Sequence, residues 1–344
     1  MRASSLWQHR MRETTKNDPE FPFYGLLPRG MGDCGMMNGN DYFGFFYPWN
    51  CLAVWADALT AEAAGVLGLD EDVRLFRGIH EEAKRDLLRS IERNAIDEGE
   101  YKWIPCTAGQ TGGSMFGALY AYYPCKLLPF SHPLIQGTLK RMEKNMSGGG
   151  LPKGLGWVTD GLWVAMALDN IGAMYLDAGM GDMSARFLYP TVNHASSLVT
   201  WCEERGAESG SSITSGDPQH LWTPLSVCRY MRDAMIHDKE DALYLAAGIP
   251  REWLAEGKRI GVENARTYHG LVGYSIVREK DALVFSLDAP GYAGREVKAM
   301  LRLPEAAKIQ IQSYEGCEAS LNEGVLRVRP NAPKCKIKFK IKKR

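Results

Sequence analysis

The stretch WNCLAVWADALTAEAAGVLG, residues 49–68, decides the fold class of this chain. Its apolar and small residues occupy nearly every side of a helix instead of one stripe. Two further stretches, SMFGALYAYYPCKLL (114–128) and GLWVAMALDNIGAMYL (161–176), share this all-round apolar character. A helix that is apolar on every side must be covered on every side, so we predict that these three segments form inner helices.

Amphipathic segments stand between the inner ones. In residues 71–95 the apolar side chains recur at helical spacing, with EEAKRD and IERN on the opposite face, which predicts a surface helix. After an opening helical segment at 4–16, the predicted helices cover residues 45–67, 71–95, 114–127, 133–146, 161–178, 183–201 and 218–237. This alternation of inner and outer helices is typical of a double ring of helices.

The connections between the predicted helices alternate in length. Residues 69–70, 129–132 and 179–182 are tight links, whereas three connections are long and rich in Gly, Ser, Thr and Trp: 97–113, 147–160 and 203–217. Successive connections in a ring of helical hairpins fall on opposite faces, so the long loops are expected to share one face. Long irregular loops in a compact domain are usually functional, which makes this face the candidate active site.

The character of the sequence changes near residue 245. Strand-like runs separated by turns follow, at residues 270–277, 282–287, 298–303 and 308–312. The last run, 335–341, alternates Lys with Ile and Phe, as a strand with one wet face does, although a charged tail is the alternative. We therefore predict a helical, catalytic-type domain at 1–244, followed by an antiparallel, sandwich-like β domain at 245–344.

The composition argues against several classes of function. The 41 basic and 41 acidic side chains balance, which argues against nucleic-acid or membrane partners held by charge. The 8 cysteines are scattered and the 7 histidines dispersed, so we expect reduced thiols, no metal site and no cofactor. No apolar run is long enough to cross a membrane, and MRASSLWQHRMRETTKND lacks the apolar core of a signal peptide, so cytoplasm is the default expectation for localisation.

The order of these features resembles the six-hairpin, or (α/α)6 toroid, glycosidase superfamily over nearly the whole chain. The resemblance is carried by YGLLPRG (24–30) with Asp33 and Asp41 before a helix, SGDPQHLWTP (215–224), GIPREWL (248–254) and TYHG (267–270). It implies a partial toroid in which 218–237 is the last helix and 4–16 the tail of the fifth. The chain is therefore expected to be the C-terminal portion of a longer enzyme, a sequence whose first residue was wrongly assigned, or one half of an enzyme split into two chains. A missing N-terminal half or a second copy would complete the ring.

The resemblance also implies where the catalytic groups lie. Glycoside hydrolysis needs one carboxylic acid to protonate the leaving oxygen and a second carboxylate to activate water or attack the sugar. In glucoamylase-like toroids these groups come from the loops before the sixth and the last helix. The candidates are therefore Asp41 or Asp33 as acid and Glu204 or Glu203 as base, with Glu208 third. Alternatively, the two aspartates form Asx turns or cap a helix, and the two glutamates are solvated charges.

Flat aromatic rings with a polar N–H suit the faces of a sugar. The candidate substrate-binding residues are Trp49, Trp103, Trp157, Trp201 and Trp222, with Gln110, Gln219, His220 and Glu208 for hydroxyl groups and Arg29 for a carboxylated sugar. A core position is the alternative for each tryptophan, and an ion pair with a neighbouring glutamate is the alternative for Arg29.

The first hypothesis for function is a glycoside hydrolase that acts on an oligosaccharide or polysaccharide. The second is a polysaccharide lyase, in which a Tyr or His removes a proton next to a uronate carboxylate. Its candidate bases are Tyr42, Tyr47, His194 and His220. A sugar phosphorylase and a non-catalytic carbohydrate-binding fragment are the remaining alternatives.

Overall fold

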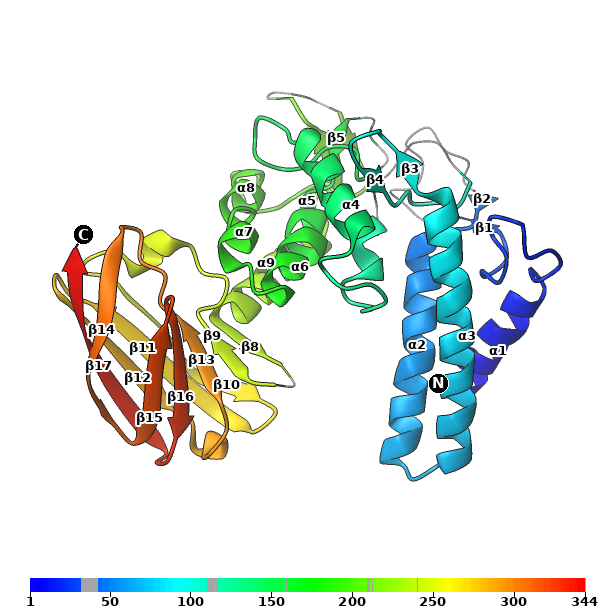
Figure 1. Ribbon diagram of the computed structural model, residues 1–344. Coiled ribbons are helices and arrows are strands. Elements are labelled where there is room, and N and C mark those ends of the chain that lie inside the picture. The colour runs from blue at the N-terminus through cyan, green and yellow to red at the C-terminus, as the bar shows by residue number, and fades with distance from the viewer. Residues whose placement is uncertain are drawn as a thin grey trace. The chain divides into compact units, whose positions relative to one another are not determined.

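The computed structural model describes residues 1–31, 43–109, 115, 117–156, 158, 160–208, 211, 213–239 and 241–343. The chain forms two compact units, one of residues 1–174 with 190–224 and one of residues 175–189 with 225–344 (Figure 1). The helical segments 175–189 and 225–235 thus pack with the second unit. The predicted limit of the folding domains at 244/245 stays a prediction.

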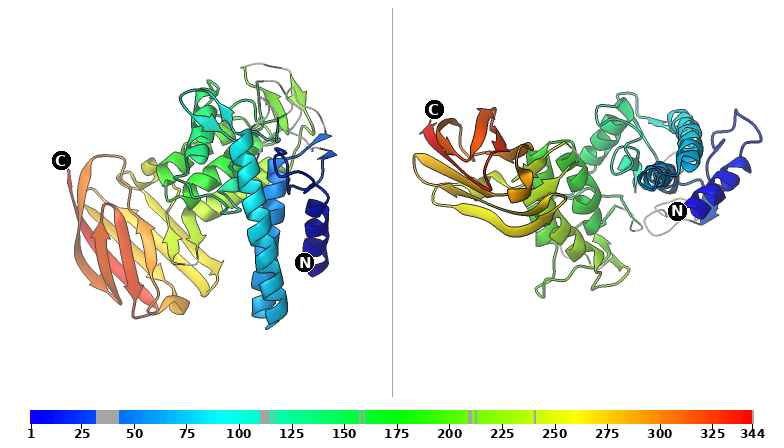
Figure 2. Two further views of the ribbon diagram at one scale, coloured as in Figure 1. Left: turned by 45° about the vertical axis from the view of Figure 1, so that its right-hand side comes forward. Right: turned by 90° about the horizontal axis from the view of Figure 1, so that it is seen from below.

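A helical hairpin and one short helix open the first unit. Helix α2 (Tyr47–Val66) has Pro48 in its first turn, and the next helix, α3 (Asp70–Asn94), begins with three acidic residues, which favourably face the positive end of the helix dipole. Gly68 takes a left-handed conformation, with φ of 71°, in the link between them. Helix α1 (Arg2–Glu13) packs against this pair (Figures 1 and 2). The predicted helices 45–67 and 71–95 are confirmed within a few residues.

Short elements make up the rest of the first unit. The strands β3 (Ile96–Asp97) and β4 (Lys102–Trp103) pair as a hairpin, and β4 packs on α4 (Pro133–Lys144). The segment 161–177 contains β5 (Gly161–Leu162), α5 (Val164–Met166), the π-helical turn η2 (Ala167–Gly172) and α6 (Ala173–Asp177). A helix at 161–178 is therefore correct in its body, but its first residues form a strand.

Two predicted helices are wrong. Within the described part of 114–127 the chain forms only the 3-10 turn η1 (Ala118–Ala121), because Gly117 is left-handed with φ of 63° and Pro124 has no N–H to continue a helix. The segment 183–201 contains α7 (Gly181–Ala185) and α8 (Leu188–Asn193), and residues 196–201 are not helical. Pro190 lies inside that segment, where a longer helix would lack a hydrogen bond.

A sandwich of two five-stranded sheets forms the bulk of the second unit (Figures 1 and 2). Helix α9 (Trp222–Met235) leads directly into β8 (Ile236–Asp238), which pairs with β9 (Leu243–Leu245). The first sheet has the order β10 (Arg259–Thr267), β11 (Gly270–Arg278), β12 (Ala282–Asp288), β17 (Lys334–Lys343) and β14 (Ala307–Glu315). The second sheet has the order β15 (Cys317–Asn322), β16 (Val325–Pro330), β13 (Val297–Met300), β9 and β8.

Buried and exposed side chains alternate along the strands, and the buried ones form the core of this sandwich. Tyr274, Phe285 and Phe339 of the first sheet and Val297 and Val328 of the second are buried in one apolar cluster. Most strand pairs are antiparallel as predicted, but β9 and β13 pair in parallel. The β domain is therefore mixed, because β9 comes from the segment directly after the last helix instead of from a neighbouring hairpin.

His237 on β8 makes the stability of the second unit depend on pH. Burial, together with the nearby charge of Lys239, lowers the pKa of His237 to about 4. The folded state holds this imidazole neutral while the unfolded chain protonates it, so stability is lost as the pH falls from about 6.5 to 4. The expected loss is up to about 3 kcal/mol. His237→Gln should remove this part of the slope in urea unfolding curves, and an unchanged slope would contradict the assignment.

Candidate functional site

A short hairpin stands before α2. Strands β1 (Gly30–Met31) and β2 (Phe43–Gly44) pair antiparallel, and Arg29 Nε donates to the carbonyl oxygen of Phe43 at 2.9 Å. The guanidinium of Arg29 also lies 5.3 Å from the centre of the Phe43 ring. The two candidate acids, Asp33 and Asp41, fall in residues 32–42, which lie outside the described residues. They belong to the segment that connects these two strands.

A hollow of about 300 Å³ adjoins this hairpin. Its lining includes Arg29 and Trp49, two of the predicted sugar-binding residues, together with Trp7, Phe46 and Asn50. Trp49 is half-buried and Trp7 is 54% exposed, so aromatic surface remains open in the hollow. The prediction missed Trp7 because the sequence places it in an opening helix far from every long loop.

Backbone hydrogen bonds connect the long loops through the residues that flank them, and join the first loop to the start of α2. In loop 97–113, Cys106 O accepts from Tyr47 N at 2.9 Å, and Ala108 N donates to Phe45 O at 3.0 Å. In loop 147–160, Gly154 O accepts from Met115 N, and Gly154 N donates to Gly161 O. Loop 203–217 then joins through a three-stranded sheet, in which β5 pairs with β6 (Glu204–Gly206) and β6 with β7 (Thr214–Ser215). These contacts agree with the expectation that the long loops lie together.

Glu204 is held tightly in this sheet. Its side chain is buried, with the residue 1% exposed, and Oε1 accepts a hydrogen bond from the backbone N–H of Val158 at 2.9 Å. Gly156 packs directly against the same carboxylate, where a side chain would collide with it. Glu204 therefore orders loop 147–160 through its carboxylate.

Glu203 is half-buried beside it. Its N–H donates to Asp217 O at 3.0 Å, and its side chain packs over Gly216, which is left-handed with φ of 69°. Glu208, the third acid of this loop, is exposed. Asp217 Oδ1 accepts from the N–H of Gln219, which is exposed, at 2.8 Å, so Asp217 forms an Asx turn ahead of α9.

Two of the predicted sugar-binding side chains, His220 and Trp222, lie near each other just after this acidic loop, and the backbone of Trp201 joins them. The Trp201 carbonyl accepts from His220 N at 2.8 Å, and the His220 and Trp222 rings are 6.1 Å apart. Nδ1 of His220 is buried and has no hydrogen-bond partner within the described residues. A buried ring nitrogen in this state suits a hydroxyl group of a ligand. Trp157 and Gln110 fall outside the described residues.

Two of the predicted tryptophans are buried. Trp103 is 1% exposed, its Nε1 donates to Glu98, and the Arg141 guanidinium lies 5.1 Å from its ring. Trp201 is 5% exposed and its Nε1 donates to Thr191 O at 2.8 Å. Both rings therefore occupy core positions, which was the alternative to sugar binding for each tryptophan.

The candidate bases for a lyase differ in their suitability. Burial raises the pKa of Tyr47 well above its ordinary value, and its hydroxyl bonds to Ser90 O at 2.9 Å. His194 Nδ1 lies 2.6 Å from Pro190 O. These contacts engage Tyr47 and His194 within the protein, and Tyr42 is outside the described residues. Among the described candidates, His220 is the one with a buried ring nitrogen that has no hydrogen-bond partner.

A metal-like cluster of His9, Glu13 and Glu82 lies between α1 and α3. Lys16 pairs with both glutamates, and its hydrogen bond lowers the pKa of Glu82. Burial alone would lower the pKa of Lys16, but its hydrogen bonds to the two carboxylates raise it overall. The ammonium group therefore occupies the place that a cation would take, and the cluster is an ion-pair network.

Cysteine is also a weak nucleophile candidate in the described part of the chain. Burial raises the pKa of Cys106 to about 12 and that of Cys125 to about 12, so both thiols stay protonated near neutral pH. The chemistry available at the long loops therefore comes from carboxylates, a histidine and indole rings.

None of the described helices is long and apolar enough to span a bilayer.

No family model and no curated protein matches this sequence. Solved structures do match in fold. α-L-Rhamnosidase from Dictyoglumus thermophilum matches with a TM-score of 0.55 and 12% identity, over 98% of this chain and 36% of that one. Streptomyces avermitilis α-L-rhamnosidase, complexed with L-rhamnose, matches with a TM-score of 0.53 and 12% identity, over 98% of this chain and 30% of that one.

These likenesses establish the fold. The chain has the architecture of a part of these two α-L-rhamnosidases, a helical portion followed by a β domain, as the sequence predicted. It spans about a third of the length of each of these two enzymes.

Proposed function

We propose that the chain is the part of a glycoside hydrolase that carries the long-loop face, with two carboxylates as its catalytic groups. The proposal is supported by the fold, which it shares with portions of two glycosidases, and by the loops that meet through backbone hydrogen bonds. The observation that carries it is the pair of acids Glu203 and Glu204 at the start of β6, with His220 and Trp222 just after loop 203–217. Sugar hydrolysis requires a pair of carboxyl groups, and aromatic rings near them suit the faces of a sugar.

In this proposal Glu203 is the general base and Glu204 orders the neighbouring loop 147–160. A base must contact the attacking water. Glu203 is partly exposed to solvent, whereas Glu204 is buried and one of its carboxylate oxygens accepts a hydrogen bond from the N–H of Val158. The general acid is Asp41 or Asp33, carried by the segment between β1 and β2. It would donate its proton to the glycosidic oxygen as the bond to the sugar breaks.

The proposed substrate contains an L-rhamnose unit or a closely related sugar. This follows the sugar bound in the Streptomyces avermitilis structure and is a proposal for this chain. The test is release of p-nitrophenol from a panel of aryl glycosides headed by the α-L-rhamnopyranoside, with the β-D-glucopyranoside for comparison. Turnover that depends on inorganic phosphate would assign the chain to a sugar phosphorylase instead of a hydrolase. An ultraviolet-absorbing unsaturated product from a uronate polymer would assign it to a lyase, and binding without turnover would leave a carbohydrate-binding fragment.

The proposal includes a partner, since a ring of helices needs more helices than this chain supplies. An N-terminal half or a second copy of the chain would complete the toroid. Sedimentation of the purified chain, alone and with candidate N-terminal halves, tests this part. A monomer with full glycosidase activity would contradict it.

His220 should contribute to sugar binding. His220→Phe keeps the ring volume but removes the buried nitrogen, so KM should rise roughly 3–10-fold with a smaller change in kcat, the cost of one neutral hydrogen bond. Steady-state kinetics on the active glycoside measures it. His269→Phe, in the turn between β10 and β11, serves as the control. A larger fall in kcat than rise in KM would instead give His220 a catalytic role.

A further inference from the structure

The strand β17 carries a column of lysines on one face of the first sheet. Its outward positions are exposed lysines, and the residues between them, Cys335, Ile337, Phe339 and Ile341, are buried in the sandwich core. The outward lysines are Lys334, Lys336, Lys338, Lys340 and Lys342. Alternate residues of a strand are about 6.6 Å apart, so the lysines form a regular row with this repeat, as the charges of a linear polymer do. The strand lies between β12 and β14, so these lysines do not guard an edge of the sheet.

Among the described cross-strand partners, carboxylates face the first two lysines of this column, with Asp288 opposite Lys334 and Glu315 opposite Lys336. Lys334 lies 3.7 Å from Asp288, but no carboxylate of the described residues lies within 4 Å of the ammonium groups of Lys338 and Lys340. Their partners across the strands are uncharged, with Ser313 opposite Lys338 and Gln310 opposite Lys340 on β14. Like charges side by side on a sheet repel one another, and the chain has no net charge that would explain the concentration here.

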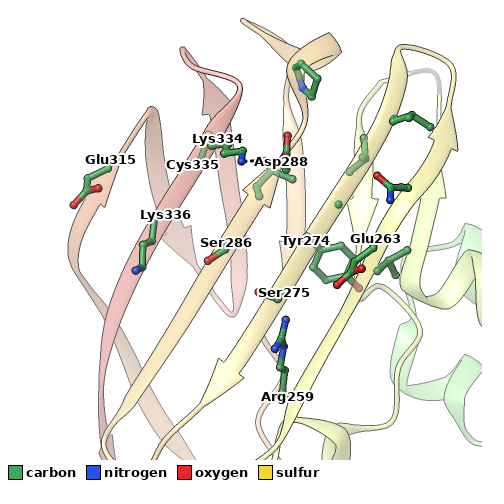
Figure 3. A pocket seen from close by; sticks show the side chains of 17 residues that line it. Arg259, Glu263, Tyr274, Ser275, Ser286, Asp288, Glu315, Lys334, Cys335 and Lys336 are labelled. Atoms are coloured by element: carbon green, nitrogen blue, oxygen red, sulfur yellow. Dashed lines mark ion pairs between the residues drawn. The ribbon is translucent and has the colours of Figure 1, made fainter.

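A hollow of about 740 Å³ adjoins the column (Figure 3). Small residues make room for it, because Gly261, Ser275 and Ser286 pair in one row that continues to Lys336. Figure 3 shows the two serines between charged side chains of both signs. Those charged side chains are Arg259, Glu263, Asp288, Glu315, Lys334 and Lys336.

We propose that this sheet face binds an acidic polysaccharide, with uronate carboxylates on the lysine column and sugar rings in the hollow. The inference rests on the proposed carbohydrate-active function. Ammonium groups bind carboxylates, and the serines offer hydroxyl groups to the sugar. The carboxylates at the hollow accept hydrogen bonds from sugar hydroxyls.

A nucleic acid fits the same face less well. A phosphodiester backbone brings no donors to Glu263, Asp288 and Glu315, which would repel it. Tyr274 is the aromatic residue of the hollow's described lining, and it is only 5% exposed, so no ring is open for a base to stack on.

The test is affinity electrophoresis of the full chain through gels that contain polygalacturonate, with dextran as the neutral polymer. Polygalacturonate should retard the chain, less so as salt is added, and dextran should not. Lys338→Gln with Lys340→Gln should weaken the binding roughly tenfold, since two exposed charge contacts are lost. Arg74→Gln with Arg77→Gln, two exposed positions on α3, removes the same charge and should leave the retardation unchanged.

Several results would overturn the inference. They are equal retardation of the lysine variant and the parent chain, tighter binding to single-stranded DNA, and tighter binding to phosphatidylserine vesicles. The release of p-nitrophenol separates this inference from the proposed function. A chain that is retarded but hydrolyses no glycoside overturns the function alone, and a chain that hydrolyses glycosides without retardation overturns the sheet-face site alone.

Discussion

A chain that carries Glu203→Gln is expected to hydrolyse its aryl glycoside about 10²–10⁴-fold more slowly, the usual contribution of a positioned base. Glutamine keeps the size of the side chain, so its packing over Gly216 is retained while its ability to accept a proton is lost. The loss should appear in kcat, because a base acts in the transition state. Initial rates under saturating substrate measure it.

The neighbouring acid supplies the comparison. In Glu204→Gln the amide oxygen can still accept from Val158 N, so the loop stays ordered, and activity should fall by less than about tenfold. The reverse ranking of the two variants would assign the base to Glu204. Full activity in both would remove the catalytic pair from this loop altogether. Glu92→Gln, exposed on α3, is the control for a lost carboxylate.

Arg12→Met should destabilise the first unit by about 3–5 kcal/mol, because it leaves a buried carboxylate without its counter-charge. Arg12 of α1 donates to Asp57 of α2 at 2.6 Å, with the two side chains 3% and 0% exposed. The pair has little other support, since Asp57 Oδ1 and two guanidinium nitrogens lack a hydrogen-bond partner among the described residues. The midpoint of urea unfolding, followed by circular dichroism, measures the loss.

Two further variants identify the cause of that loss. Arg2→Met breaks an exposed pair with Asp72, 3.1 Å long, and should cost less than about 1 kcal/mol. Arg12→Met combined with Asp57→Leu should recover most of the stability, because an apolar pair replaces the buried charges. If Arg12→Met alone costs no more than Arg2→Met, the buried pair is not what joins α1 to α2.

Local patterns predicted much of the fold. The helices 45–67, 71–95 and 133–146 and the strands 270–277, 282–287 and 335–341 could be read from spacing alone, because each buries one continuous set of side chains. Strand β10 could not, since its register shifts between Val262 and Ala265 and interrupts the two-residue alternation. The predicted helix 218–237 ends at Met235, directly before β8, and β9 was not predicted. Their pairing with distant β13 leaves no local signal.

The site was predictable as a group of loops and less so as individual contacts. Loop length and composition indicated where the chain is irregular, and the structure brings these loops together. Whether a given tryptophan is open or covered depends on packing by distant residues, such as Arg141 over Trp103. The sequence held no sign of that contact.

The direct passage from α9 into β8 has a practical consequence for dividing the chain. A recombinant fragment that starts at residue 246 would lack both β8 and β9, and β13 would then offer unpaired N–H and C=O groups to other molecules. Such a fragment should aggregate on expression. One that starts at residue 225 retains both strands and most of the helix before them, and it is the better choice for studying the sandwich by itself.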